Sequence, residues 1–417
     1  MKLYPADILL PDFSRVDGTR WSCVACDQFT SEPEYWKAAA GFREGYPSAL
    51  DLIVPEAFLG ESGNIIAKIR SSMRSFLSNG ILRLRENCGG YVERTLSDGS
   101  VRRGLVAAVD LEDYDPSPAS KSPVRPTEKT VPERIPPRLE VRRGAVLEAP
   151  HIMLLADDRD NRMLGRFDGM PADAYSYPLA EGGGYLKGSF VPASVFREIN
   201  DALAGFGRGR KDPIILAVGD GNHSLATAKA AFEELKLKIG REAAAHHPAR
   251  YCLCETVSIY DPSLVFEPIY RLLTFKGSPS EQKRESDRLL SAFVSFLESG
   301  NAEETYGPGS FTAVSSAGES VVAAKKMPCS LPVIALQRFL DAYAAERPVF
   351  DLDYIHGADS VRRLARAAGR LGFLFDGIEK SALFEAVEKD GCLPRKTFSM
   401  GSAEDKRYYT ECRRIGL

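Results

Sequence analysis

The chain has 417 residues, of which 44% are hydrophobic and 27% charged, and its formal net charge is −3 at pH 7. This is an ordinary globular composition, and the length suits two or three units of about 150 residues each or one elaborated body. The slightly acidic balance argues against a nucleic-acid-binding protein, and no stretch approaches the roughly 20 apolar residues of a membrane span. Pro5 and Asp7 stand where a signal peptide needs an apolar core. We therefore expect a cytoplasmic protein.

The first part of the chain predicts one helix, one hairpin and an acidic turn. Residues 64–78 carry apolar side chains at helical spacing. Residues 81–92 and 101–111 alternate like strands around Asp98-Gly99, the strongest short hairpin signal. Asp27 lies between a strand-like run and a helix start, a position more typical of a turn residue than of a catalyst.

Eight cysteines are scattered along the chain. Cys23-x-x-Cys26 and Cys252-x-Cys254 could together supply four thiolate ligands for zinc. Neither pair lies in a glycine-rich knuckle, and the second pair lies in a run that alternates like a strand. We favour reduced cysteines that pack in the core.

Residues 115–138 contain seven prolines, which oppose regular structure. A long irregular stretch inside a compact chain is usually a linker or a functional loop. Arg125, Glu128 and Thr130 lie in this segment. By composition alone, solvated charges in a linker are the simpler interpretation.

Residues 214–239 predict a strand, a tight turn and a helix. The run 214–218 is short, apolar and flanked by turn residues, which indicates a buried strand. From Leu225 to Ile239 apolar residues recur every three or four positions among Lys and Glu, which indicates an amphipathic helix.

The turn between that strand and helix reads Asp220-Gly221-Asn222-His223. A helix amino terminus offers unpaired N–H groups and attracts phosphate, and glycine lets the backbone approach a ligand. Asp220 could hold Mg²⁺ or take a proton, and His223 could bind a phosphate oxygen. The simpler alternative is that Asp220 and Asn222 only shape the turn and cap the helix. For the four residues together we favour a functional turn.

The remaining chain predicts a mixture of strands and helices, ending in a basic turn and a polar tail. A phosphate could be bound jointly by Arg395, Lys396, Thr397 and Ser399. A basic turn before a surface helix is equally compatible. Residues 404–414 read as the polar tail. We expect an α+β fold with a mixed sheet core and flanking helices. We divide it into a main body, 1–275, and a smaller α/β unit, 276–417, whose Lys396 segment returns to the main body.

Five motifs resemble those of a bacterial and archaeal family of unknown function, DUF1015, over nearly the whole chain. They are Val24-Ala25-Cys26-Asp27-Gln28-Phe29-Thr30, Arg125-x-Thr127-Glu128-x-Thr130, Asp220-Gly221-Asn222-His223, Asp261-Pro262-x-Leu264 and Pro394-Arg395-Lys396-Thr397. The family more often has His at position 127 and His-Arg after the glycine of the third motif. That turn is also similar to the nucleotide turn of the ParB/sulfiredoxin superfamily, which includes an ADP-dependent kinase of free serine.

The resemblance implies a nucleotide-dependent phosphotransferase that acts on a small hydroxy metabolite, with free serine as the best guess. It implies ADP or ATP and Mg²⁺ as cofactors, with Asp220 at the metal. Asp220 and His223 would meet the phosphates, and Glu128 would be the general base. Further phosphate or substrate contacts would come from Asp27, Arg125, Thr130, Asn222, Arg395, Lys396 and Thr397. Two alternatives stay open: a nucleotide-binding regulatory module without turnover, and a phosphomonoester hydrolase. The sequence indicates no oligomeric state.

Overall fold

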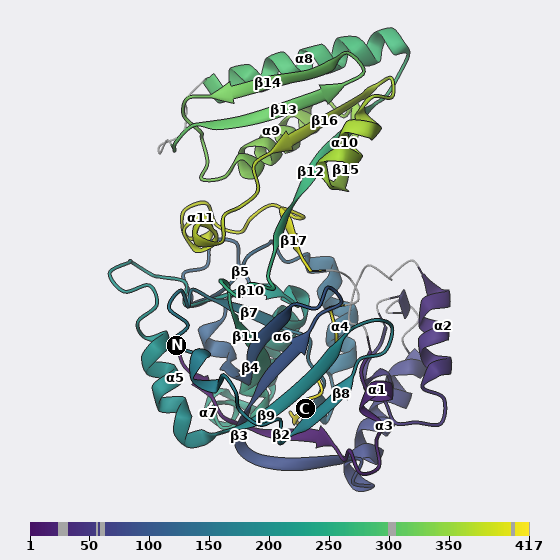
Figure 1. Ribbon diagram of the computed structural model, residues 1–417, viewed down its shortest axis with the longest axis vertical. Coiled ribbons are helices and arrows are strands. Elements are labelled where there is room, and N and C mark those ends of the chain that lie inside the picture. Colours follow the sequence, from purple (N-terminus) through teal and green to yellow (C-terminus); the bar gives the residue numbers. More distant parts are fainter. Residues whose placement is uncertain (24–31, 56, 59–62, 299–305, 402–404, 417) are drawn as a thin grey trace. The chain divides into compact units, whose positions relative to one another are not determined.

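The computed structural model describes residues 1–417 except 24–31, 56, 59–62, 299–305, 402–404 and 417. It has the expected α+β fold, with a large mixed sheet, a smaller antiparallel sheet and flanking helices (Figure 1). The chain forms two compact units. Unit 1 comprises Met1–Leu264 and Gly401–Leu417, and unit 2 comprises Val265–Met400.

Within the described residues, unit 1 contains a curled 12-stranded sheet whose main path runs β5-β10-β7-β11-β4-β3-β2-β18-β6. β1 joins at β4, and the β8–β9 pair joins at β3. The β5–β10 and β7–β11 pairs are parallel, and the other described pairs are antiparallel. The strands are β1 Leu3–Tyr4, β2 Ala6–Pro11, β3 Leu82–Thr95, β4 Val101–Asp110, β5 Val124–Pro126, β6 Leu147–Glu148, β7 Met153–Ala156, β8 Tyr175–Pro178, β9 Tyr185–Pro192, β10 Leu216–Asp220, β11 Tyr251–Ser258 and β18 Cys412–Arg414.

Both faces of this sheet are covered, which explains the continuous apolar run in β4. Leu105 and Ala107 point into a core that includes Phe232 of α6, whereas Val106 and Ala108 point into a second core on the other face. A strand buried on both faces needs apolar residues at every position.

The helices of unit 1 are α1 Gly18–Trp21, α2 Pro33–Phe42, α3 Gly63–Ser78, α4 Ile135–Arg142, α5 Phe196–Leu203, α6 Asn222–Ile239 and α7 Arg241–Ala245, with 3₁₀ turns at Ala49–Leu52, Leu111–Asp113, Pro132–Arg134, Gly165–Phe167, Ala193–Val195 and Pro248–Arg250. The expected helix over 64–78 and the hairpin at Asp98-Gly99 are confirmed.

The proline-rich segment is more regular than expected. It contains β5 and the 3₁₀ turn Pro132–Arg134, and α4 starts within it. β5 ends the strand path, so Pro126 sits in an edge strand, where a missing N–H is tolerated. Pro132 and the prolines of α4 lie in first helical turns, which need no N–H donor.

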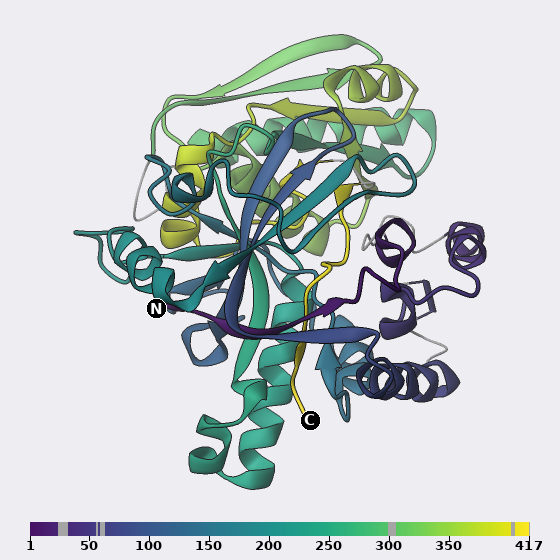
Figure 2. The ribbon, with the colours of Figure 1, turned by 60° about the horizontal axis from the view of Figure 1, so that its bottom comes forward.

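The expected polar tail is instead built into unit 1 (Figure 2). β18 pairs with β2 and β6, and the segment before it is mostly buried. The Tyr409 hydroxyl donates to the backbone oxygen of Ile152 at 2.7 Å, and Arg413 Nε donates to Glu148 Oε1 at 2.9 Å. Its charged and hydroxyl groups are therefore bound by partners far away in the sequence.

Unit 2 contains a six-stranded antiparallel sheet, counted over the described residues, in the order β14-β13-β16-β12-β15 with β17 beside β12. Phenylalanines from its strands and helices pack together, among them Phe293, Phe311, Phe339 and Phe373. β13 and β14 form an antiparallel hairpin, with Ser315 opposite Gly318. The elements are β12 Phe266–Phe275, α8 Pro279–Glu298, β13 Gly309–Ser315, β14 Gly318–Ala324, α9 Pro332–Glu346, β15 Phe350–His356, α10 Ala358–Ala365, β16 Arg370–Phe375, the 3₁₀ turn Lys380–Ala382, α11 Leu383–Asp390 and β17 Phe398–Met400.

The two units divide at Leu264/Val265, ahead of the division expected near residue 275. β12 pairs with β15, β16 and β17, so the whole strand belongs to unit 2. Lys396 also belongs to unit 2, and the chain re-enters unit 1 at Gly401. No helix in the described ranges combines the length and apolar character needed to cross a bilayer.

Candidate functional site

The turn between β10 and α6 has a backbone that only glycine fits. Gly221 has φ 76° and ψ 24° and is the N-cap of α6. A Cβ at this position would collide with the backbone oxygen of His151. Because glycine has no side chain to cap the helix, the first-turn N–H groups and the positive end of the helix dipole face the turn.

Asp220 ends β10 beside two nitrogen-bearing side chains. Its Oδ1 accepts from the Gly221 N–H at 2.8 Å, and its Oδ2 lies 3.4 Å from His151 Nε2 and 3.5 Å from Lys406 Nζ. Burial acts to raise the pKa of Asp220, but Lys406 and His151 lower it far below its ordinary value. Asp220 is therefore an ionised carboxylate at neutral pH, with 26% of its side chain exposed.

Sequence reasoning missed His151 and Lys406, which come from distant segments. β7 follows His151 and runs antiparallel to β10, with Met153 opposite Asp220. His151 Nδ1 lies 3.0 Å from the backbone oxygen of Arg407, so the C-terminal segment passes directly beside it. No local pattern marks either residue, because only the strand pairing and the path of the C-terminus bring them to the turn.

The loop after β5 lies against the same turn. The Thr127 hydroxyl donates to the backbone oxygen of Val218 at 2.8 Å, and Asn222 Nδ2 donates to the backbone oxygen of Glu128 at 2.8 Å. The Val131 N–H donates to His223 Nε2 at 3.2 Å. The structure thus brings the predicted residues Glu128, Asn222 and His223 together.

The bond from Val131 to His223 Nε2 fixes the imidazole against the loop after β5. One buried polar atom beside the turn, Thr130 Oγ1, has no hydrogen-bond partner within the described ranges. Buried polar atoms normally have partners, so such atoms mark a place for water or a ligand.

Arg125 lies in β5 and is buried. Its guanidinium donates to the backbone oxygens of Ser122, at 2.7 Å, and of Asp212. These bonds fix the loop that leads into β5, and the predicted phosphate contact of Arg125 stays a prediction.

The predicted basic turn belongs to unit 2 and has a defined local structure. Buried Arg271 donates to the backbone oxygen of Lys396 at 3.0 Å, and Thr397 Oγ1 donates to that of Pro394 at 2.7 Å. Arg395 and Lys396 are exposed. Their predicted phosphate contacts, with that of Thr397, stay predictions, and Asp27 lies outside the described residues.

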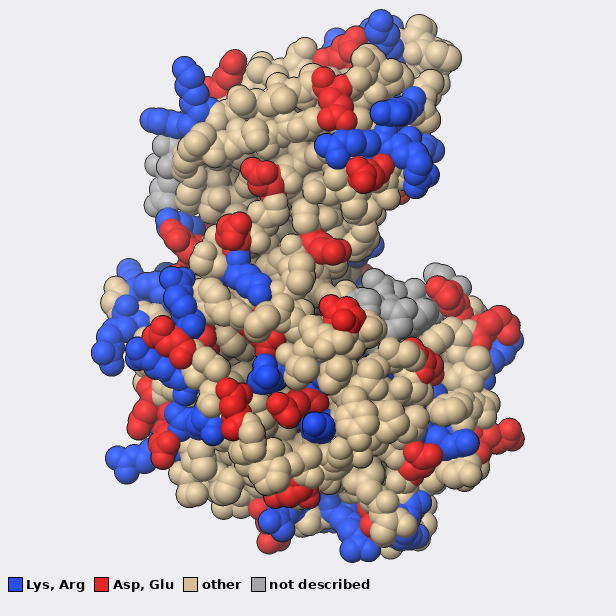
Figure 3. Space-filling view, viewed as in Figure 1, with Lys and Arg blue, Asp and Glu red and all other residues tan. Residues whose placement is uncertain are grey.

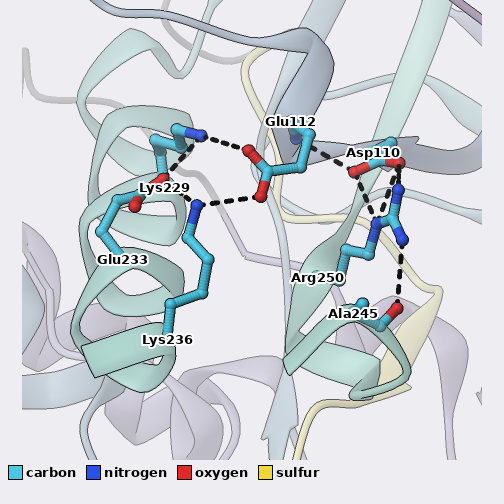
Figure 4. A network of polar contacts seen from close by, with 7 residues as sticks. All are labelled: Asp110, Glu112, Lys229, Glu233, Lys236, Ala245 and Arg250. Carbon is cyan, nitrogen blue, oxygen red and sulfur yellow. Dashed lines mark hydrogen bonds and ion pairs between the residues drawn. The ribbon is translucent and has the colours of Figure 1, made fainter. Parts of the chain in front are cut away.

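Helix α6 is held against the end of β4 by a charged network (Figure 4). The Glu112 carboxylate contacts Lys229 Nζ at 3.2 Å and Lys236 Nζ at 2.8 Å. Nearby, Asp110 pairs with Arg250 at 2.6 Å. The two lysine contacts join α6 to the turn that follows β4. On the face shown in Figure 3, acidic and basic side chains are interspersed.

Asp220 could help to hold Mg²⁺ only together with other ligands. No group of three or more His, Cys, Asp or Glu side chains placed to hold a metal ion occurs in the described part of the chain. Mg²⁺ commonly takes one or two carboxylates plus substrate phosphates and water. The single carboxylate of Asp220 fits that pattern if the ion arrives with a nucleotide.

Comparisons with solved structures give likenesses of low identity. Free serine kinase variants in complex with AMP and with ADP each have a TM-score of 0.35 and 12% identity; the first alignment covers 71% of this chain and 87% of that chain, and the second 72% and 88%. A conserved hypothetical protein from Pyrococcus furiosus has a TM-score of 0.31 and 11% identity, covering 71% and 90%. At TM-scores below 0.5 these likenesses carry no functional conclusion.

Comparisons of the sequence give one family. No curated protein matches the chain. The model of a family described as "Protein of unknown function (DUF1015)" matches residues 12–343. Because this match spans more than half of the chain, the protein belongs to the DUF1015 family.

Proposed function

We propose that this protein is a nucleotide-dependent phosphotransferase that acts on the hydroxyl group of a small metabolite. The observation that supports this best is the turn at Gly221. It combines an uncapped helix amino terminus, the ionised carboxylate of Asp220 and the cation of Lys406. Free serine is the first acceptor to test, with ADP or ATP as donor and Mg²⁺ as the accompanying ion. These choices, and a ParB/sulfiredoxin-like reading of the turn, come from the motif resemblance.

The proposed chemistry divides between binding and proton transfer. The first-turn N–H groups of α6 donate to phosphate oxygens, and His223 in the same turn is a further phosphate contact. Glu128 takes the proton of the substrate hydroxyl, whose oxygen attacks the terminal phosphorus of the nucleotide. The bond from that phosphorus to the bridging oxygen breaks, which gives a phosphate monoester and a nucleotide shortened by one phosphate. Phosphoryl transfer depends mainly on such positioning and charge stabilisation.

The test is product analysis with two matched variants. Wild-type protein, ADP or ATP, Mg²⁺ and serine should yield phosphoserine in a phosphorus NMR spectrum. Glu128→Gln should abolish this product and leave the thermal shift caused by nucleotide unchanged. The exposed Glu133, five positions further on, provides the control Glu133→Gln, which should keep full activity.

Three outcomes would redirect the proposal. Full activity in Glu128→Gln would remove Glu128 as the base. Nucleotide binding without transfer to serine or to other small alcohols would favour a regulatory module. Phosphate released from phosphoserine without nucleotide would favour a hydrolase.

A further inference from the structure

We propose that Lys406 is the phosphate-binding cation of this site, and that the C-terminal segment 405–414 is an integral part of the site. This inference rests on the proposed function and deepens it, because it assigns a residue from the presumed tail to the recognition of the nucleotide phosphates. The proposal adds a cation to the one that the sequence suggested at Arg125, whose guanidinium binds the backbone oxygens of Ser122 and Asp212.

The position of the ammonium group carries the proposal. Lys406 Nζ lies 3.5 Å from Asp220 Oδ2, and Asp220 directly precedes the N-cap of α6. The side chain is 25% exposed, so the ion pair is open enough for a ligand to reach. An ammonium group has three donor hydrogens, which allows it to contact a carboxylate and an anionic ligand together. The helix terminus and Lys406 favour the same kind of ligand, an anion.

The residue before Lys406 is fixed to the β3–β4 hairpin. Asp405 accepts from the Ser97 N–H at 3.0 Å and from the Ser97 hydroxyl at 3.3 Å. Its backbone oxygen accepts from Arg94 Nη1 at 3.3 Å, and Arg94 is buried. The backbone that carries Lys406 is therefore held on its amino side by three hydrogen bonds.

The residue after Lys406 is fixed even more firmly. The Arg407 side chain is fully buried, and it donates to Glu181 Oε2 at 3.1 Å and to the backbone oxygen of Ala180 at 2.6 Å. A buried guanidinium is costly unless its donors are bound, so these contacts specify the path of the chain. The backbone oxygen of Arg407 also contacts His151 Nδ1. Lys406 thus projects from a backbone ordered before any ligand binds, which lowers the entropy cost of binding.

A purely structural Lys406 would behave differently in one measurable respect. If it only neutralised Asp220, its loss would weaken ADP binding through repulsion from the uncompensated carboxylate, and Asp220→Asn combined with Lys406→Met would restore ADP binding. If it contacts phosphate, ADP binding must stay weak in this double variant, and the loss must grow with the number of phosphates on the ligand. Titrating the double variant without added metal therefore separates the two roles, and restored ADP affinity in it would overturn the proposal.

The experiment is calorimetric titration of the full chain with adenosine, AMP and ADP at fixed ionic strength. Lys406→Met should weaken ADP binding about tenfold or more, the scale of a lost charge-assisted contact. AMP binding should weaken less and adenosine binding not at all. Lys406→Arg, which keeps the charge, should stay within about threefold of wild type for ADP. Lys238→Met, at an exposed position near the other end of α6, should match wild type.

Equal ADP affinity in Lys406→Met and wild type would overturn the Lys406 proposal and leave the proposed function standing. So would an equal loss for all three ligands. Wild-type protein that binds none of the three ligands would instead contradict the proposed function itself. Tryptophan fluorescence checks that the variant is folded. Should Lys406→Met unfold, Lys406→Gln is titrated in the same way, and unchanged ADP affinity in it would equally overturn the proposal.

Discussion

A buried carboxyl group in the C-terminal segment should make the stability of unit 1 depend on pH. Glu411 is 3% exposed, and its Oε1 accepts from the Tyr175 hydroxyl at 2.7 Å. Burial raises the pKa of Glu411 from 4.5 to about 7, and the hydrogen bond from Tyr175 offsets only part of that rise. The difference between these two pKa values corresponds to a change of about 3 kcal/mol in the free energy of unfolding of unit 1.

The folded protein holds the proton of Glu411 more tightly than the unfolded protein does. The pKa is higher in the folded than in the unfolded protein, so the stabilising contribution of the protonated group is complete below about pH 4.5 and is lost as the pH rises through about 7. Glu411→Gln stays neutral and keeps an acceptor for Tyr175. It should stabilise unit 1 by up to about 3 kcal/mol at pH 8 and change little at pH 4.5.

Urea unfolding followed by tryptophan fluorescence measures the stability of unit 1. The chain has two tryptophans, and both Trp21 and Trp36 are buried in unit 1. Glu86→Gln, at an exposed position of β3, is the control and should leave the pH profile of the wild type unchanged. A stability gain in Glu411→Gln that is equal at the two pH values, or absent at pH 8, would refute the reasoning.

Three further variants test the framework of the site. Gly221→Ala should disrupt the turn and abolish nucleotide binding. The control is Gly240→Ala at the other end of α6, where a Cβ meets no atom within 4 Å but φ 86° and ψ 155° favour glycine. It should cost about 1–3 kcal/mol and leave nucleotide binding intact, and calorimetry and urea unfolding measure both variants. Glu112→Gln should destabilise unit 1 by about 0.5–1 kcal/mol at low salt and by less in 1 M NaCl, because its carboxylate is 43% exposed; a loss that does not depend on salt would contradict the ion-pair account. Thr127→Val should cost about 1 kcal/mol through the lost bond to β10, and an unchanged urea midpoint would show that this bond does not hold the loop.

Local patterns predicted the elements that build the site. Apolar periodicity located the strand and helix on either side of Asp220, and the Asp98-Gly99 signal located the β3–β4 hairpin. These features depend on neighbouring residues, so a single sequence contains enough information to find them. The chemistry proposed for the turn rests on the residue types between the two elements and stays a prediction.

Charged segments were misread because their partners are remote in the sequence. The C-terminal segment resembles a solvated tail, yet Arg407 binds Glu181 and Arg413 binds Glu148. Each of these pairs joins residues that only the folded sheet brings together. The contact between the Arg125 guanidinium and the backbone oxygen of Asp212 likewise joins residues far apart in the sequence. No pattern within the C-terminal segment could have indicated that Lys406 faces Asp220.

The most direct test of the central claim is a crystal structure of the protein with bound ADP. It should show the nucleotide phosphates at the first-turn N–H groups of α6, within hydrogen-bonding distance of Lys406 Nζ. Density for the phosphates at any other place on the protein, with the turn at Gly221 unoccupied, would contradict the account.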